Sequence, residues 1–207
     1  MKHCSNTNIN QRLTANALKE MIASFLLSRD NNGTIGYEVM YGSSRRVADM
    51  VFISKGHSYA IEIKSEFDTT NRLENQLQEY QLLFDYILIF TAPKHLEPIN
   101  AILPKYVGLY SISESGIQQK KREKINRHVL KSEMLISIPS AAVKNNFSIK
   151  GKLTSDEIRS VVMKMSYKSI HNYFISYYIE KLSVRRTRNN TKVPTTPIDT
   201  EEDYIII

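Results

Sequence analysis

The pattern of apolar and polar positions predicts a strand-rich first half of the chain. Alternation predicts strands at residues 36–41, 47–54 and 57–65. A continuous apolar run at 86–91 is typical of a strand covered on both faces, and a last strand is expected at 106–113. Apolar residues at helical spacing predict further elements, namely a helix that begins at Thr14, one over 71–84 that is N-capped within 68–71, and a short one over 95–103.

The second half of the chain predicts helices. The charged run 118–127 is expected to begin a helix, and Thr154 to Glu157 has the spacing of a capping box. The segment 166–182 predicts another helix, whose tyrosines are expected in the core rather than stacked on bases. We therefore expect three parts, namely an α/β domain at 1–117, a basic helical region at 118–183 and a mobile tail at 184–207, whose acidic, apolar end has an open role.

Charge separates these parts. The chain has a net charge of +7, but residues 120–192 alone hold 17 Lys and Arg against 5 Asp and Glu. The last 15 residues hold 4 acidic residues and no basic one. A strongly basic region beside a near-neutral domain indicates a polyanionic partner, of which DNA is the first choice and RNA the second. A solvated basic surface is the alternative.

Candidate chemistry lies between residues 46 and 80. Alternation in a strand places Glu62 and Lys64 on one face, and Asp49 precedes them on the neighbouring apolar run. Two carboxylates offer hard oxygen ligands for Mg²⁺ or Mn²⁺, and the lysine faces the charge that develops on a phosphate. Gln76 and Tyr80 follow on the next helix, one turn apart. This combination indicates a phosphodiesterase.

The order of elements, the Asp…Glu-x-Lys spacing and the downstream Gln-x-x-x-Tyr resemble the PD-(D/E)xK phosphodiesterase superfamily, over about residues 14–113. The Gln76–Tyr80 spacing is similar to that of the RecB-like and lambda-exonuclease-like branch. The surrounding sequence resembles a family of small uncharacterised bacterial proteins within the superfamily. The resemblance implies a restriction-endonuclease-like fold, a mixed sheet flanked by helices. It also implies a bacterial or phage nuclease that hydrolyses DNA with Mg²⁺ or Mn²⁺.

The resemblance also implies roles for individual residues. Asp49 and Glu62 would hold the metal together with the backbone carbonyl of Ile63. Lys64 would hold the attacking water or stabilise the transition state, and Gln76 would orient the lysine or the water.

Further residues complete this expected site. Glu20 on the first helix is the first choice for an additional metal ligand, and Glu38 on the first strand is the second. Arg46, Arg72 and Tyr80 are expected to contact the substrate.

Other interpretations of the same residues stay open at this level. Asp49 could pair with Arg45 or Arg46, and Glu62 with Lys64 could be a surface pair on an edge strand. The chain could also be a catalytically inactive nuclease fold that serves as an adaptor, binding nucleic acid or a partner protein.

The remaining expectations concern the setting of the protein. The lone cysteine, Cys4, cannot form an intramolecular disulfide, and no apolar run approaches the roughly 20 residues that span a bilayer. We therefore expect a cytoplasmic protein that does not enter the membrane. A homodimer would suit a nuclease that cuts both strands of a duplex.

Overall fold

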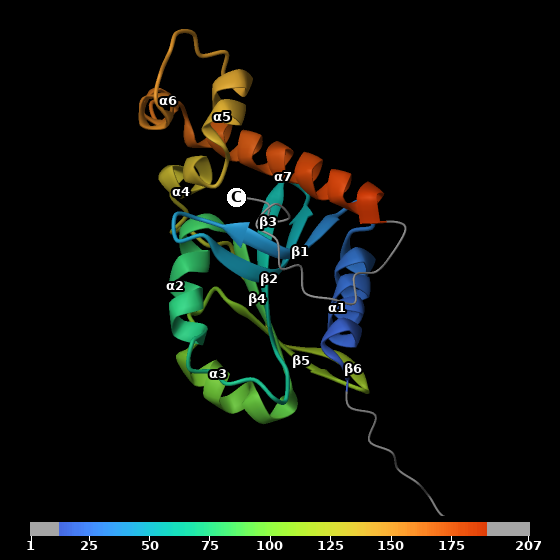
Figure 1. Cartoon of the computed structure of the whole chain (residues 1–207). Helices are drawn as coiled ribbons and strands as arrows, with labels where there is room; N and C mark the ends of the chain where they lie inside the picture. The colour runs from blue at the N-terminus through green and yellow to red at the C-terminus, as the bar shows by residue number, and fades with distance from the viewer. Residues whose placement is uncertain (1–12, 190–207) are drawn as a thin grey trace, which may run out of the picture.

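The computed structural model describes residues 13–189, and of residues 184–189 only the backbone. A six-stranded sheet in the order β1–β6 is flanked by helices on both faces (Figure 1). The strands are β1 (Thr34–Tyr41), β2 (Arg46–Ser54), β3 (His57–Lys64), β4 (Tyr86–Thr91), β5 (Gly108–Ser113) and β6 (Gly116–Lys121). The helical elements are α1 (Ala15–Arg29), α2 (Leu73–Leu83), the 3-10 turn η1 (Pro93–His95), α3 (Leu96–Ile102), α4 (Lys131–Ile136), α5 (Ser140–Asn146), α6 (Ser155–Val162) and α7 (Tyr167–Asn189).

Strand pairing makes the sheet mixed. β1, β2 and β3 pair antiparallel in hairpin order, β3, β4 and β5 pair parallel, and β6 returns antiparallel to β5. The parallel pairs require crossovers, which α2 and the η1–α3 segment supply. The expected class, an α/β protein with a mixed sheet flanked by helices and followed by a helical region, is confirmed.

The two faces of the sheet bury different layers. Met50 and Phe52 of β2 face α1, in a core that includes Leu18, Ile22 and Leu26 of that helix. The alternate residues of β2, Val51 and Ile53, belong to the second core, which takes in α2, α3 and the helices after β6. Strand alternation thus assigns residues 50–53 of β2 to the two layers in turn, whereas Ala48 lies in the second core together with Val51 and Ile53. The helices that follow residue 121 extend the second core.

Helix α7 lies against the sheet at β1 and β2 (Figure 1). Its approach depends on Gly36, because a Cβ at this position would lie 2.5 Å from a methyl carbon of Leu182. The tyrosines of α7 behave as expected in part, since Tyr177 and Tyr178 are buried in the second core. Tyr167, by contrast, is 45% exposed at the beginning of the helix.

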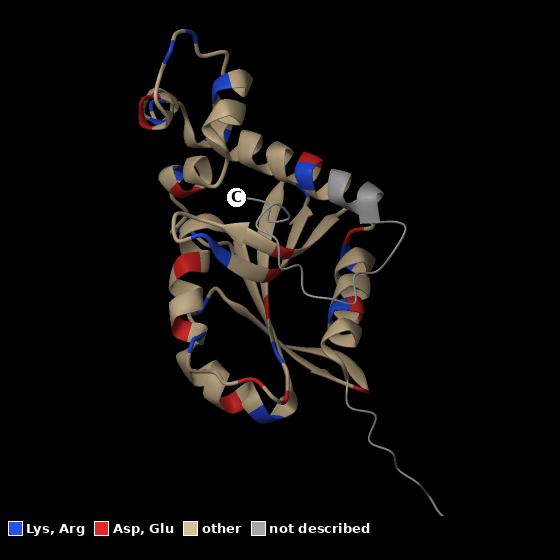
Figure 2. Ribbon diagram, viewed as in Figure 1, with Lys and Arg blue, Asp and Glu red and all other residues tan. Residues whose placement is uncertain are grey.

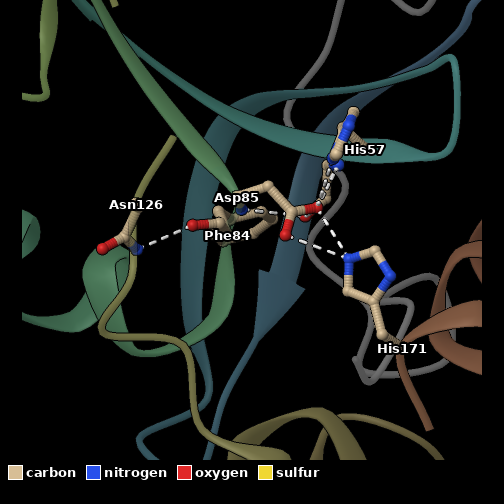
Figure 3. A network of polar contacts seen from close by, with 6 residues as sticks. His57, Phe84, Asp85, Asn126 and His171 are labelled. Carbon is tan, nitrogen blue, oxygen red and sulfur yellow. Dashed lines mark hydrogen bonds and ion pairs between the residues drawn. The ribbon is translucent and has the colours of Figure 1, made fainter. Parts of the chain in front are cut away.

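A buried aspartate ties α7 to the strands. Asp85, which precedes β4, accepts hydrogen bonds from the backbone N–H and the hydroxyl of Ser58, at 2.8 and 3.0 Å (Figure 3). His171 of α7 places its Nε2 at 2.9–3.0 Å from both Asp85 oxygens. Asn126 donates to the Phe84 carbonyl at 2.8 Å, which fixes the segment after β6 beside the end of α2. These contacts lie at the start of β3 and β4.

Several sequence-based expectations were wrong in detail. Residues 118–121 of the charged run 118–127 belong to strand β6, and residues 122–127 form neither a helix nor a strand. The segment 68–71 does not cap α2, because the Asp68 carboxylate instead accepts from the backbone N–H of Ser65 at 2.7 Å, and Arg72 occupies the N-cap position. Helix α7 continues to Asn189, into the segment expected to be a tail. Cys4 and the remainder of the expected tail lie outside the described residues.

Candidate functional site

Adjacent strands bring the two expected metal ligands together. Because Met50 pairs with Ile61 in the β2–β3 ladder, Asp49 and Glu62 lie side by side, and the backbone N–H of Ile63 donates to Asp49 Oδ2 at 2.8 Å. Lys64 lies two residues beyond Glu62, on the same face of β3. This is the face that carries α2. The structure therefore gathers these three side chains at the point where β3 ends.

Glu62 is the centre of the site. It is only 2% exposed, and its carboxylate accepts from Lys64 Nζ at 2.7 Å, Gln76 Nε2 at 2.7 Å and Tyr80 Oη at 2.6 Å. Lys64 Nζ also donates to Gln76 Oε1 at 3.1 Å. A buried carboxylate normally requires such a set of donors. Gln76 thus contacts both partners of the Glu62–Lys64 ion pair and fixes the position of the ammonium.

The charge on Asp49 is poorly compensated. Burial, followed by the negative charge of Glu62, raises the pKa of Asp49 to about 7, although the Ile63 N–H and Lys64 act in the opposite direction. Burial and the same Glu62 charge raise the pKa of Tyr80 well above its ordinary value. Tyr80 consequently remains a hydrogen-bond donor at neutral pH, while Asp49 is held close to its titration point.

This arrangement suits a hard divalent cation with few protein ligands. Mg²⁺ is commonly held by one or two carboxylates, with waters and substrate phosphates completing its octahedron. Asp49 and Glu62 supply two carboxylates, and their mutual repulsion is the kind of interaction that a cation relieves. Within the described part of the chain, no group of three or more His, Cys, Asp or Glu side chains is arranged to hold a metal. The donor set therefore fits Mg²⁺ or Mn²⁺ only with help from the backbone and the substrate.

Of the two candidates for a further carboxylate, Glu38 lies closer to the pair. It sits between Tyr37 and Val39, which pair with Met50 and Ala48, so that it faces Asp49 across the β1–β2 ladder. Its φ of 48° breaks the regular strand, and its charge contributes to the raised pKa of Asp49. Glu20, which the sequence favours, is exposed on α1 and is not among the main causes of that shift.

The three expected substrate contacts have different surroundings. Tyr80 is fully buried, so its hydroxyl positions Glu62 and cannot reach a substrate. Arg46 pairs with Glu79 of α2 at 2.7 Å. Arg72 is exposed at the beginning of α2, one turn before Gln76, where it can still contact a phosphate.

The structure differs from the two alternative interpretations of these residues, namely a surface pair on an edge strand and an ion pair of Asp49 with a neighbouring arginine. Glu62 and Lys64 are buried on β3, which lies inside the sheet between β2 and β4, so they are not a surface pair on an edge strand. Asp49 accepts its hydrogen bond from a backbone N–H, whereas Arg46 pairs with a different carboxylate.

The sequence did not identify a cavity at the ends of β3, β4 and β5, on the face of the sheet that carries α1 rather than α2. It has a volume of about 370 Å³, begins at Ser65 directly after Lys64, and includes the exposed aromatic ring of Phe67. No signal in the sequence points to this cavity, because a single exposed aromatic ring is common on protein surfaces.

Comparison with known proteins places the chain in a phage protein family. The family model described as "Bacteriophage P4 protein cII" matches residues 8–192, and the chain therefore belongs to this family. The chain is 27% identical over 197 residues to protein cII of Enterobacteria phage P4, a match that covers 79% of this chain and 74% of cII. The expected bacterial or phage origin agrees with this family.

A solved structure also aligns with the chain. It is a protein of unknown function from Silicibacter pomeroyi, with 14% identity and a TM-score of 0.49, and the alignment covers 95% of this chain and 100% of that protein. A similarity of this size is too low to assign a function. None of the helices within residues 13–189 is long and apolar enough to cross a bilayer.

Proposed function

We propose that this protein is a metal-dependent phosphodiesterase that hydrolyses DNA and that its sheet is a restriction-endonuclease-like core. The order of elements supports this, because a helix precedes three antiparallel strands and α2 then crosses over to the parallel strand β4. The carboxylates and the lysine lie on the second and third strands, as the resemblance to the PD-(D/E)xK superfamily implies.

The observation that carries the proposal is the convergence of four polar side chains on one buried point. Asp49 and Glu62 lie side by side, and Lys64 Nζ is held between Glu62 and Gln76 at 2.7 and 3.1 Å. Burying two carboxylates and a lysine is unfavourable for stability, since each charge loses its hydration. A chemical use for the cluster accounts for that penalty.

Each residue then has a role in hydrolysis. When bound by Asp49, Glu62 and the Ile63 carbonyl, Mg²⁺ or Mn²⁺ would supply Lewis acidity toward the phosphate and lower the pKa of a bound water. Lys64 holds the attacking water or faces the negative charge that grows on the phosphate oxygens. Gln76 keeps the lysine in place through the hydrogen bond described above. Tyr80 keeps the Glu62 carboxylate aligned.

The basic region supports DNA as the substrate. Lys and Arg positions occur in the loop between α5 and α6 and on the helices beside it (Figure 2). Lys150 and Lys152 are both exposed in that loop. Exposed lysines neutralise phosphates and release counterions, so binding should weaken steeply with salt. Replacing both with glutamine should reduce the slope of log affinity against log salt by about 2.

The test is cleavage of labelled single- and double-stranded DNA with Mg²⁺, Mn²⁺ or EDTA. We expect metal-dependent cutting that falls at least about 100-fold in Lys64→Ala. Lys55→Ala, which removes an exposed lysine from the β2–β3 turn at the far end of β3, is the matched control and should keep wild-type activity. Equal cutting by both variants would refute the assignment of the site. DNA binding without cutting under any condition would instead favour the adaptor.

A further inference from the structure

An exposed tyrosine lies where β3 and β4 begin, at the end of the sheet opposite to Lys64. Tyr167, the first residue of α7, is 45% exposed. Its ring stacks on His171, with centroids 5.5 Å apart and planes inclined by 19°. His171 is itself held by the buried Asp85 carboxylate (Figure 3). A partly exposed ring that is stacked on an anchored neighbour is a preformed platform for a further flat group.

The turn before this tyrosine is held in one position. Lys131 donates to the carbonyls of Met163 and Met165 at 2.6 and 2.9 Å. The backbone N–H of Ser169 donates to the Ser166 hydroxyl at 3.2 Å, which supports the first turn of α7. The position of the tyrosine is therefore set before a ligand binds, so binding requires little further ordering of the chain.

Two exposed lysines flank the tyrosine. Lys164 lies in the turn before α7, and Lys168 follows Tyr167 directly. Neither lysine forms an ion pair with another residue that the structure describes. The sequence between Glu157 and Glu180 contains no acidic residue. The charges that this stretch of the chain places beside the ring are therefore positive.

A second basic segment, residues 122–130, passes the same ends of the strands. The backbone N–H of Asn126 donates to the Asp85 carbonyl at 2.8 Å. This contact places the segment beside the residue whose carboxylate anchors His171. The exposed basic side chains of the segment are Arg122, Lys124 and Arg127. Asp85 thus joins the two basic parts of this surface.

The acidic groups nearby do not neutralise these charges. Glu123, the one acidic residue of the segment 122–130, is buried and paired with Arg29. Asp85 is buried as well, and its carboxylate already accepts two hydrogen bonds from one serine. Burial and the charge of Lys124 lower the pKa of Lys121, so neighbouring positive charges repel each other here. A polyanion would relieve this repulsion.

We propose that the surface formed by Tyr167, Lys164, Lys168 and the exposed basic residues of the segment 122–130 binds a single strand of nucleic acid. One base stacks on Tyr167, and the lysines and arginines contact the phosphates. The bases of a duplex are already paired and stacked, so a duplex can use only the charges. This inference does not depend on the proposed hydrolysis, because the surface and Lys64 lie at opposite ends of β3.

A fluorescence titration tests the stacking directly. The chain contains no tryptophan, so Tyr167→Trp provides a single reporter that can still stack on a base. The full chain is titrated in EDTA with a deoxythymidine or a uridine strand of about 12 nucleotides. The fluorescence should fall on binding. Glu114→Trp, which changes an exposed residue between β5 and β6 at the opposite end of the strands, is the matched control and should show no change.

Affinity measurements separate the ring from the charges. Tyr167→Ala should weaken the binding of single strands about tenfold, whereas Tyr167→Phe should keep the wild-type affinity. A duplex should bind equally to the wild type and to Tyr167→Ala. Replacing both Lys164 and Lys168 with glutamine should reduce the slope of log affinity against log salt by about 1.4. Lys94→Gln, which changes an exposed lysine after β4, should leave the slope unchanged.

Quenching of Tyr167→Trp by the deoxythymidine strand, the uridine strand or both supports the inference, and the stronger effect identifies the nucleic acid. Constant fluorescence of Tyr167→Trp with wild-type affinity of Tyr167→Ala would overturn it. Equal quenching by a duplex would overturn the preference for a single strand. An acidic segment of a partner protein, with apolar side chains to cover the exposed Leu130 and Met163, would then be the better occupant.

This inference and the proposed nuclease fail in different ways. Binding that depends on Tyr167, without metal-dependent cleavage of any substrate, would keep the binding surface and refute the nuclease. Cleavage that Lys64→Ala abolishes, together with binding that is unchanged in Tyr167→Ala, would keep the nuclease and refute the binding surface.

Discussion

Replacing Asp49 with asparagine should stabilise the metal-free protein at pH 8. Asparagine has nearly the same shape, and its side-chain oxygen can still accept the Ile63 N–H that Asp49 accepts at 2.8 Å. The substitution removes a negative charge that is partly buried beside Glu62. The folded state should therefore lose a repulsion and keep its hydrogen bond.

The size of the effect follows from the pKa. A change from 3.8 in the unfolded chain to about 7 in the fold corresponds to about 4 kcal/mol of lost stability when Asp49 is charged in both states. Because the Asp49 side chain is partly exposed to solvent, we expect asparagine to recover about 1–3 kcal/mol. Since the pKa is raised on folding, this penalty is full above about pH 7, declines as the pH falls, and vanishes near pH 4.

Urea denaturation in EDTA at pH 8 and pH 5 measures this difference. The gain from Asp49→Asn should be large at pH 8 and clearly smaller at pH 5. Asp156→Asn, which changes a side chain that is 99% exposed, is the control and should stay within about 0.5 kcal/mol of the wild type at both values. Mg²⁺ should stabilise the wild type at pH 8 and should have little effect on Asp49→Asn. A loss of stability in Asp49→Asn that is equal at both pH values would refute the electrostatic reasoning.

Three further substitutions test the supports of the site. Tyr80→Phe removes one of the donors to buried Glu62 and should reduce the free energy of unfolding by about 1–3 kcal/mol in urea titrations, and no loss would contradict the positioning role. Asp85→Ala leaves the Ser58 N–H without its acceptor and should reduce the free energy of unfolding by at least about 2 kcal/mol. Because His171 also loses its partner, hydrogen exchange should become faster in α7 than in α1. Uniform exchange in both helices would argue against a specific anchor. Thr154→Ala removes the capping box of α6 and should lower the free energy of unfolding by about 1 kcal/mol. DNA cleavage should stay unchanged in this variant, whereas variants of the site should lose it.

Local patterns in the sequence predicted the elements that form the candidate site. The strand at 86–91 is observed at these residues, because an unbroken apolar run is stable only where both faces are covered. The alternation around Glu62 and Lys64 placed both on one face, and the structure has them 2.7 Å apart. The capping box at Thr154 was also found as predicted. In each case the physical cause lies within a few neighbouring residues.

Features that depend on distant contacts could not be predicted in this way. The polar run at 118–121 resembles a solvated helix, but an edge strand also carries charged residues, which discourage pairing with other chains. Glu38 has a φ of 48° within the β1–β2 ladder, and nothing in the neighbouring sequence marks this position. The contact between His171 and Asp85 joins residues 86 positions apart. Such long-range pairs decide where α7 lies, and periodicity carries no information about them.

Helix α7 and the candidate site lie at opposite ends of the central strands. The contacts of Asp85 with Ser58 and His171 anchor this helix where β3 and β4 begin. Lys64 lies at the opposite end of β3. The cavity that Phe67 lines lies at the same ends of the strands. The carboxyl ends of the parallel strands, at which open α/β sheets generally bind their ligands, are therefore the side from which we expect a substrate to approach. The anchor and the site are separated along the same strand, so variants at Asp85 should change stability before they change the chemistry at Lys64.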